Sequence, residues 1–96
     1  MNKIYELHAD MCKVFSNPTR LEILNLLRDK EMSVTELIQK TYLSQANISQ
    51  HLAIMKYKGI VIARRDGKNI HYKIAYPRLI KAFDIIKEVL SEKHKL

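Results

Sequence analysis

The chain has 96 residues, 47% of them hydrophobic, with only two glycines, two prolines and one cysteine. This length and composition fit a single domain with its own core, and they argue against a disordered chain or a secreted protein held by disulfides. The excess of 17 lysines and arginines over 10 acidic residues gives a net charge of +7, which favours a polyanionic partner.

No apolar run approaches the roughly 20 residues of a membrane-spanning helix, and the first residues lack the apolar core of a signal peptide. A single cysteine is typical of an intracellular protein. We therefore expect a cytoplasmic protein without a membrane partner.

Two helices are predicted at the start of the chain. Apolar side chains at spacings of three and four predict the first helix over about residues 3–15. Asn17 suits the N-cap of a second helix, and Pro18 suits its first position. Because this second helix is apolar over most of its girth, we expect it to form the buried centre of the domain.

Residues 33–58 predict a helix-turn-helix. Ser33 and Glu36 can form a capping box for a short helix, and Ser44 can cap the helix that follows the turn. The inward stripe of that second helix is predicted to be Ile48, Leu52 and Met55. Gly59 then suits the left-handed conformation that ends a helix.

Residues 60–75 predict a β-hairpin, or wing. Residues 60–65 resemble a strand, Asp66 and Gly67 signal a turn, and apolar residues alternate from Ile70 to Ile74. Pro77 then begins a last helix that reaches about residue 93. The predicted order is α-α-α-α-β-β-α, which is a mainly α fold with a small β-hairpin. It is typical of one winged helix-turn-helix domain over residues 1–96.

The outward face of the second helix in the helix-turn-helix is small, polar and uncharged. Glutamine can pair with adenine, serine can hydrogen-bond to several bases, and alanine can contact the thymine methyl group. A neutral, solvated helix face is the alternative, but the adjacent cationic hairpin favours binding to double-stranded DNA. The residues predicted to read bases are Gln45, Ala46, Ser49 and Gln50.

A second group of residues is predicted to hold the DNA backbone. Cationic side chains at the wing can reach phosphates or enter the minor groove. His51 is expected to be partly buried and to bridge either to the core or to a phosphate. The predicted backbone contacts are Ser44, His51, Lys56, Arg64, Arg65, Lys68 and Asn69.

The terminal helices, residues 1–15 and 77–94, carry apolar stripes that suit packing between subunits. A two-fold dimer would place two reading helices about one DNA turn, ~34 Å, apart. The alternative is that both helices only cover their own core. The predicted dimer-interface residues are Ile4, Leu7, Met11, Leu79, Phe83, Ile86 and Leu90.

Three segments in order resemble the ArsR/SmtB repressors: residues 15–24, residues 43–52 and residues 59–72. The resemblance covers about residues 8–90. It implies a homodimeric winged-helix transcription factor, usually a repressor that leaves its operator when an effector binds. It also implies that the first and last helices form the dimer interface, and that Gln45, Ser49 and Gln50 meet DNA.

The metal-binding patterns of that family are missing from this sequence. The segment 31–36 holds hydroxyl side chains rather than paired cysteines, and Ile86 stands where the last helix would need a histidine after Asp84. We therefore predict no metal and no cofactor. The alternative is a metal site built from His8 and Cys12, with His94 as a third candidate ligand, although Cys12 is expected to be a small buried hydrophobic residue.

An enzyme is not expected, because the chain has no glycine-rich phosphate loop and no nucleophile with an obvious local base. The acids of the last helix, from Asp84 to Glu92, alternate with lysines and are interpreted as a solvated face. Two other functions stay open: a winged-helix module that binds proteins, and a DNA-binding activator or nucleoid-type protein. The sequence identifies neither the operator nor an effector.

Overall fold

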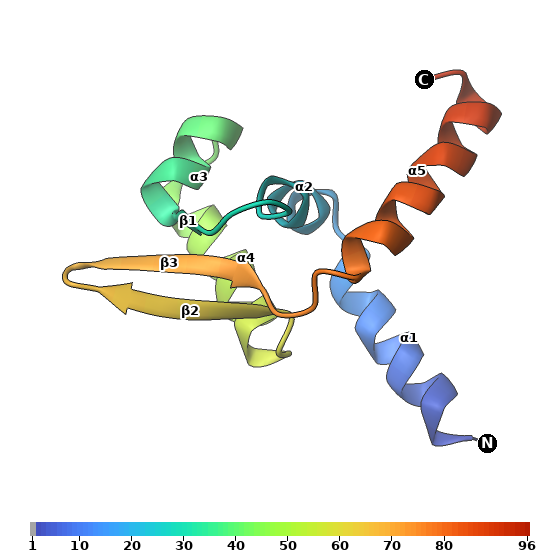
Figure 1. Ribbon diagram of the computed structural model, residues 1–96, viewed down its shortest axis with the longest axis horizontal. Helices are drawn as coiled ribbons and strands as arrows, with labels where there is room; N and C mark the ends of the chain where they lie inside the picture. The colour runs from blue at the N-terminus through green and yellow to red at the C-terminus, as the bar shows by residue number, and fades with distance from the viewer. Residues whose placement is uncertain (1) are drawn as a thin grey trace.

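The computed structural model describes residues 2–96, and over these residues the predicted elements follow one another in the expected order (Figure 1). The helices are α1 (Lys3–Phe15), α2 (Pro18–Leu26), α3 (Val34–Thr41), α4 (Gln45–Tyr57) and α5 (Leu79–His94). The strands are β1 (Met32–Ser33), β2 (Val61–Asp66) and β3 (Asn69–Ile74). The fold is therefore mainly helical with a small antiparallel sheet.

Two details differ from the sequence prediction. A two-residue strand, β1, precedes α3 and pairs with β3, so that the sheet has the order β1-β3-β2. Two residues are too few to show the alternation of apolar and polar side chains that predicts a strand. β1 is recognised only by its pairing with β3, which is distant in the sequence. The last helix begins at Leu79 rather than at Pro77, since Pro77 and Arg78 form a turn that precedes it, closed by the backbone N–H of Leu79 donating to the carbonyl of Tyr76.

Every helix and strand except α5 contributes at least one buried side chain to the core. The second helix is only partly central: Ile23 and Leu24 are fully buried, but Leu21 is 39% exposed, which corrects the expectation of a helix buried over most of its girth. The buried hydrophobic residues are Val14, Ile23, Leu24, Leu27, Met32, Leu37, Ile48, Leu52, Met55, Ile60, Val61 and Ile74.

The helix-turn-helix has the predicted caps. The hydroxyl of Ser33 accepts from the backbone N–H of Glu36 at 3.2 Å, and the Glu36 carboxylate accepts from the backbone N–H of Ser33 at 3.1 Å. This reciprocal pair is the predicted capping box. The hydroxyl of Ser44 accepts from the backbone N–H of Asn47 at 3.1 Å and so caps α4.

The end of α4 directs the chain into the wing. Gly59 has a φ of +74°, the left-handed conformation that was predicted, and the backbone N–H of Ile60 donates to the carbonyl of Met55 at 2.8 Å. These features are those of a Schellman motif, in which glycine avoids the steric cost of a Cβ atom. β2 starts at the next residues, and the hairpin turns at Gly67 and extends away from the helices (Figure 1).

The terminal helices diverge from a common region, so that the two ends of the chain lie far apart (Figure 1). The C-terminal end of α1 and the first half of α5 pack on the core, where the rings of Phe15 and Phe83 meet edge to face at 4.8 Å between centroids. Farther out, α5 buries no residue, and Ile86 on α5 and Ile4 on α1 are more than half exposed. These helices therefore leave apolar surface that the core of this chain does not cover.

Candidate nucleic-acid interface

The rotation of α4 is set by the three side chains that it buries. Ile48, Leu52 and Met55 are completely inaccessible to solvent, as predicted. Because residues on a helix repeat every 3.6 positions, the opposite face must point outward. The proposed base-reading residues are accordingly all exposed: Gln45, Ala46, Ser49 and Gln50.

His51 lies at the edge of this exposed face and is half-buried against α2. The Arg20 Nε–H donates to Nδ1 of His51 at 3.1 Å, and the same guanidinium donates to the carbonyl of Val14 at 3.4 Å. Since Nδ1 accepts, the neutral ring carries its proton on Nε2. The part of the prediction in which His51 bridges to the core is thus confirmed. Contact with a phosphate stays a prediction.

Burial and the nearby Arg20 cation both lower the pKa of His51 below its ordinary value of 6.5. Protonation would place a second positive charge beside Arg20. It would also remove the lone pair that accepts the hydrogen bond from Arg20. The side-chain hydrogen bond that joins α4 to α2 therefore requires a neutral His51.

The arginines of the wing differ in their surroundings. The Arg64 guanidinium forms an ion pair with Glu31, in which Nε donates to the carboxylate at 3.0 Å and Nη2 makes a second contact. This pair lowers the pKa of Glu31 and raises the pKa of Arg64. Arg64 is therefore not the free cation that the sequence suggested, because an acidic side chain 33 residues away already partners it.

Other predicted backbone contacts remain available. Arg65, Lys68 and Asn69 are exposed around the hairpin turn, and neither Arg65 nor Lys68 forms an ion pair within residues 2–96. Lys56 is exposed in the last turn of α4. The hydroxyl oxygen of Ser44 is used as a cap, but its proton is still free to be donated.

The alternative metal site is not assembled within one protomer. His8 and Cys12 are exposed on α1, whereas His94 lies near the far end of α5 (Figure 1). No group of three His, Cys, Asp or Glu side chains in the described residues could hold a metal ion. Cys12 is exposed, which corrects the expectation of a buried hydrophobic residue, because Val14 and Phe15 point α1 toward the core instead.

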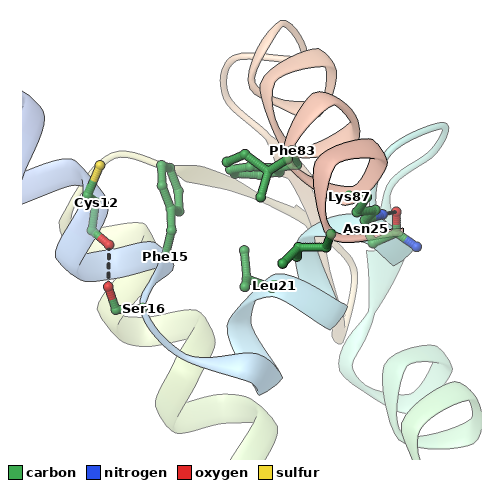
Figure 2. Close-up of a pocket in the computed structure, with 9 residues that line it drawn as sticks. Cys12, Phe15, Ser16, Leu21, Asn25, Phe83 and Lys87 are labelled. Atoms are coloured by element: carbon green, nitrogen blue, oxygen red, sulfur yellow. Dashed lines mark hydrogen bonds between the residues drawn. The ribbon is translucent and has the colours of Figure 1, made fainter. Parts of the chain in front are cut away.

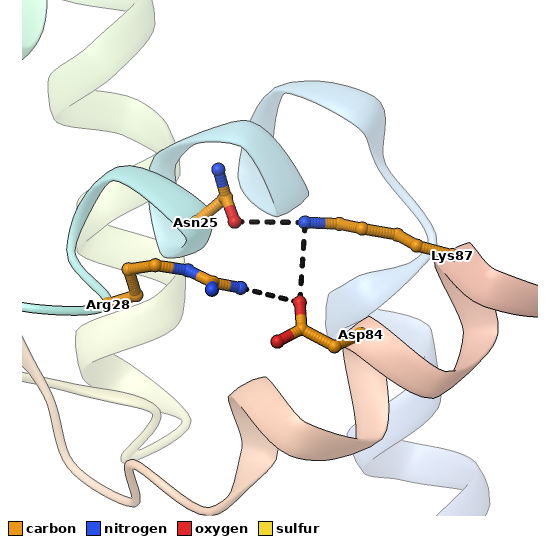
Figure 3. A network of polar contacts seen from close by, with 4 residues as sticks. All are labelled: Asn25, Arg28, Asp84 and Lys87. Carbon is orange, nitrogen blue, oxygen red and sulfur yellow. Dashed lines mark hydrogen bonds and ion pairs between the residues drawn. The ribbon is translucent and has the colours of Figure 1, made fainter. Parts of the chain in front are cut away.

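The polar contacts that α5 makes with α2 and with the turn after α2 were not predicted from the sequence (Figure 3). The Arg28 guanidinium donates to Asp84 at 2.5 Å, and Lys87 lies 3.7 Å from Asp84 and donates to Asn25 at 2.9 Å. The bond from Arg28 is the main reason that the pKa of Asp84 is lowered. Asp84 thus ties α5 to Arg28 in the turn that follows α2, and it is not part of a merely solvated face.

Comparison with known proteins supports this architecture. A model of the arsR family of bacterial regulatory proteins matches residues 17–63. Rv0081 of Mycobacterium tuberculosis, named an uncharacterized HTH-type transcriptional regulator, is 36% identical over 89 residues, covering 92% of this chain and 78% of that protein. Its crystal structure gives a TM-score of 0.82 at 34% identity over 96% of this chain and 93% of that chain.

Two further solved structures are similar along most of the chain. Mb0332 of Mycobacterium bovis, described as a homodimeric winged helix-turn-helix DNA-binding domain, gives a TM-score of 0.82 at 30% identity and covers 96% of this chain and 89% of that chain. HlyU of Vibrio cholerae gives 0.78 at 30% identity and covers all of both chains. HlyU is named a transcriptional activator, whereas other matching proteins are named repressors.

A capped helix-turn-helix followed by a cationic hairpin defines a winged helix-turn-helix transcriptional regulator, a class of DNA-binding proteins. The chain belongs to the arsR family of bacterial regulatory proteins. Members of this family are transcriptional regulators rather than enzymes. No helix in residues 2–96 is long and apolar enough to cross a membrane.

The lowered pKa of His51 predicts a pH-dependent stability. Between its folded-state pKa and the ordinary value of 6.5, the unfolded chain binds more protons than the folded protein. The free energy of unfolding is therefore fully retained above pH 6.5 and falls as the pH drops below it. Urea unfolding at pH 7.5 and 5.5 should show this loss in the natural protein and a smaller loss in His51→Gln. Equal losses would contradict the role given to His51.

Proposed function

We propose that this protein is a homodimeric transcriptional repressor that binds a specific double-stranded operator and is released by an effector. In this proposal it acts in the cytoplasm and has no catalytic activity, metal or cofactor. The observation that carries it is the exposed, uncharged face of α4, on a helix packed against β2 of a hairpin whose tip is cationic. The family membership supports the same function.

The outward face of α4 would enter the major groove. Gln45 and Gln50 have amide groups that can donate to and accept from one adenine, while Ser49 can do either with several bases. Ala46 adds a methyl group that can contact thymine and lets the helix approach closely. This face has no charge, so phosphate binding alone would not explain its composition.

The wing would hold the DNA backbone. We expect Arg65, Lys68 and Asn69 to contact phosphates or the minor groove directly, with Lys56, Ser44 and His51 as further contacts from α4. Arg64 would bind a phosphate only by exchanging its carboxylate partner Glu31. That exchange would give up the ion pair, so we expect a contact from Arg64 to add less to DNA binding than a contact from Arg65.

Dimerisation would use the terminal helices. Ile4, Leu7, Ile86 and Leu90 are between 42% and 58% exposed, which is unfavourable for apolar side chains facing water. The partly buried side chains of Met11, Leu79 and Phe83, where α1 and α5 meet the core, would complete the interface. The homodimeric state of Mb0332 supports this assembly. Two-fold symmetry would then present two α4 helices to half-sites ~34 Å apart.

Repression is proposed over activation because the resemblance to the ArsR/SmtB repressors implies it, and several similar proteins are named repressors. HlyU shows that a similar chain can activate. A reporter gene fused to the bound promoter distinguishes repression from activation: if the protein is a repressor, reporter expression should rise when the gene for this protein is deleted.

A protein-binding module is the other alternative. It would show no salt-dependent, sequence-selective binding to promoter DNA in fluorescence anisotropy.

Removing one glutamine should reduce sequence discrimination. Gln50→Ala should lose about 1–3 kcal/mol of preference for an operator selected from a random DNA pool over a scrambled duplex. Gln39→Ala is the matched control, since this exposed glutamine lies on α3. Anisotropy titrations at one salt concentration measure both preferences. Unchanged discrimination by Gln50→Ala would show that the base-reading face is assigned wrongly.

The two wing arginines should respond differently to substitution. Arg65→Ala should weaken binding to every DNA sequence and reduce the salt slope of log K by about one, because one phosphate contact is lost. Arg64→Ala should have a smaller effect, and Glu31→Gln should strengthen binding by freeing Arg64. Titrations over a salt series measure these slopes. If Glu31→Gln weakens binding, Arg64 depends on its carboxylate partner to act.

A further inference from the structure

Tyr42 is an exposed aromatic residue in the turn between α3 and α4. Its side chain is 90% exposed, the largest exposed fraction of any large hydrophobic residue from 2 to 96. The exposed apolar residues of α1 and α5 border the groove in Figure 2, which the second subunit of the proposed dimer would cover. Because α3 lies away from both terminal helices (Figure 1), dimerisation does not account for Tyr42.

The backbone of Tyr42 adopts the left-handed conformation, with a φ of 61° and a ψ of 17°. Within residues 2–96 the only other positive φ values belong to Gly59, Gly67 and Lys95, which follows the last helix. A Cβ atom is crowded in this conformation, so glycine is the usual residue at such a helix end. The turn of a helix-turn-helix also often contains glycine. A tyrosine at this position is therefore strained.

The turn itself does not need an aromatic side chain. It is held by the backbone N–H of Tyr42, which donates to the carbonyl of Ile38 at 2.8 Å, and by Leu43, which packs against the core. Glycine at position 42 could form the same backbone hydrogen bond without the strain. A ring that is almost fully exposed gains little from packing that would offset the strain. Such outliers are concentrated at functional sites, so we expect the compensating contact to lie outside the chain.

The position of Tyr42 indicates what that contact is. Tyr42 comes three residues before Gln45, the first residue of α4, so their Cα atoms are at most about 11 Å apart. In helix-turn-helix proteins the N-terminal residues of the reading helix contact bases, and the preceding helix crosses the DNA backbone. A turn between these two helices lies beside the phosphates at the edge of the groove. A tyrosine hydroxyl can donate to a phosphate oxygen.

We propose that Tyr42 contacts the DNA backbone at the N-terminal end of α4, with its hydroxyl donating to a phosphate oxygen. This inference rests on the proposed DNA-binding function and adds a contact to it. The wing follows the opposite end of α4, because β2 begins just after Gly59. Contacts from Tyr42 and from the wing would thus hold α4 in the major groove from both of its ends.

Tyr42→Phe removes only the hydroxyl group. A dimer would lose two hydrogen bonds, each worth a factor of about two to ten in affinity, so operator binding should weaken at least about fivefold. The salt slope of log K should stay unchanged, because a neutral hydroxyl releases no counterion. The affinity for a scrambled duplex should fall by the same factor, since a phosphate carries no sequence information. Fluorescence anisotropy over a salt series measures all three quantities.

The matched control is Tyr5→Phe, which removes the hydroxyl of another exposed tyrosine, on α1 and away from α3 and α4 (Figure 1). Its operator affinity should equal that of the natural protein. Equal weakening by Tyr5→Phe and Tyr42→Phe would overturn the contact assigned to Tyr42.

Tyr42→Gly separates a binding role from a structural one. Relief of the left-handed strain offsets the greater freedom of glycine in the unfolded chain. At one protein concentration, the midpoint of thermal unfolding should therefore be at least as high as that of the natural protein. Operator binding should nevertheless fall at least as far as in Tyr42→Phe. A residue needed only for folding would instead lose thermal stability.

The outcomes distinguish this contact from DNA binding as a whole. Unchanged operator binding by Tyr42→Phe, or a lowered midpoint in Tyr42→Gly, would overturn the contact and leave DNA binding by α4 and the wing standing. A loss confined to the operator would overturn the assignment to a phosphate, because the hydroxyl would then read a base. If the natural protein bound no duplex selectively, the proposed function would fail and the contact with it.

Discussion

The burial of Ile48, Leu52 and Met55 is the constraint on which the proposed function depends. These three side chains are fully excluded from water, so turning α4 about its axis would expose part of this stripe and bury polar groups in its place. The cost of such a rotation fixes which residues face outward. The Schellman motif at Gly59 and the contact of α4 with β2 then fix where the wing begins relative to that face.

Charge on this surface is divided between two tasks. Arg20, Arg28 and Arg64 are engaged inside the protein, with His51, Asp84 and Glu31 respectively. The cations around the hairpin turn are free of such partners within residues 2–96. The net charge of +7 therefore overstates the number of cations that DNA can use. The ion pair of Arg64 with Glu31 also explains why Arg64 and Arg65, which are neighbours on β2, are expected to contribute unequally to DNA binding.

Local signals predicted most of the fold. The capping box at Ser33, the cap at Ser44 and the glycine that ends α4 each involve residues close in sequence, and all three are present. The apolar spacing of α4 also identified its buried face correctly. These features can be predicted because their physical causes act within one or two helical turns.

Contacts between distant segments could not be predicted in this way. The pairing of β1 with β3, the hydrogen bond from Arg20 to His51 and the ion pair of Arg28 with Asp84 join residues at least 31 positions apart. The exposure of Cys12 likewise depends on how α1 packs against the rest of the molecule. No periodicity or cap reports such tertiary arrangements.

The most direct test of the DNA-binding surface is a map of backbone amide NMR shifts as a selected operator duplex is added. The account predicts that the largest changes fall on residues 44–50 and 65–69, with much smaller changes along α3. Changes confined to α1 and α5, or no saturable change at all, would contradict the proposal that α4 and the wing bind DNA.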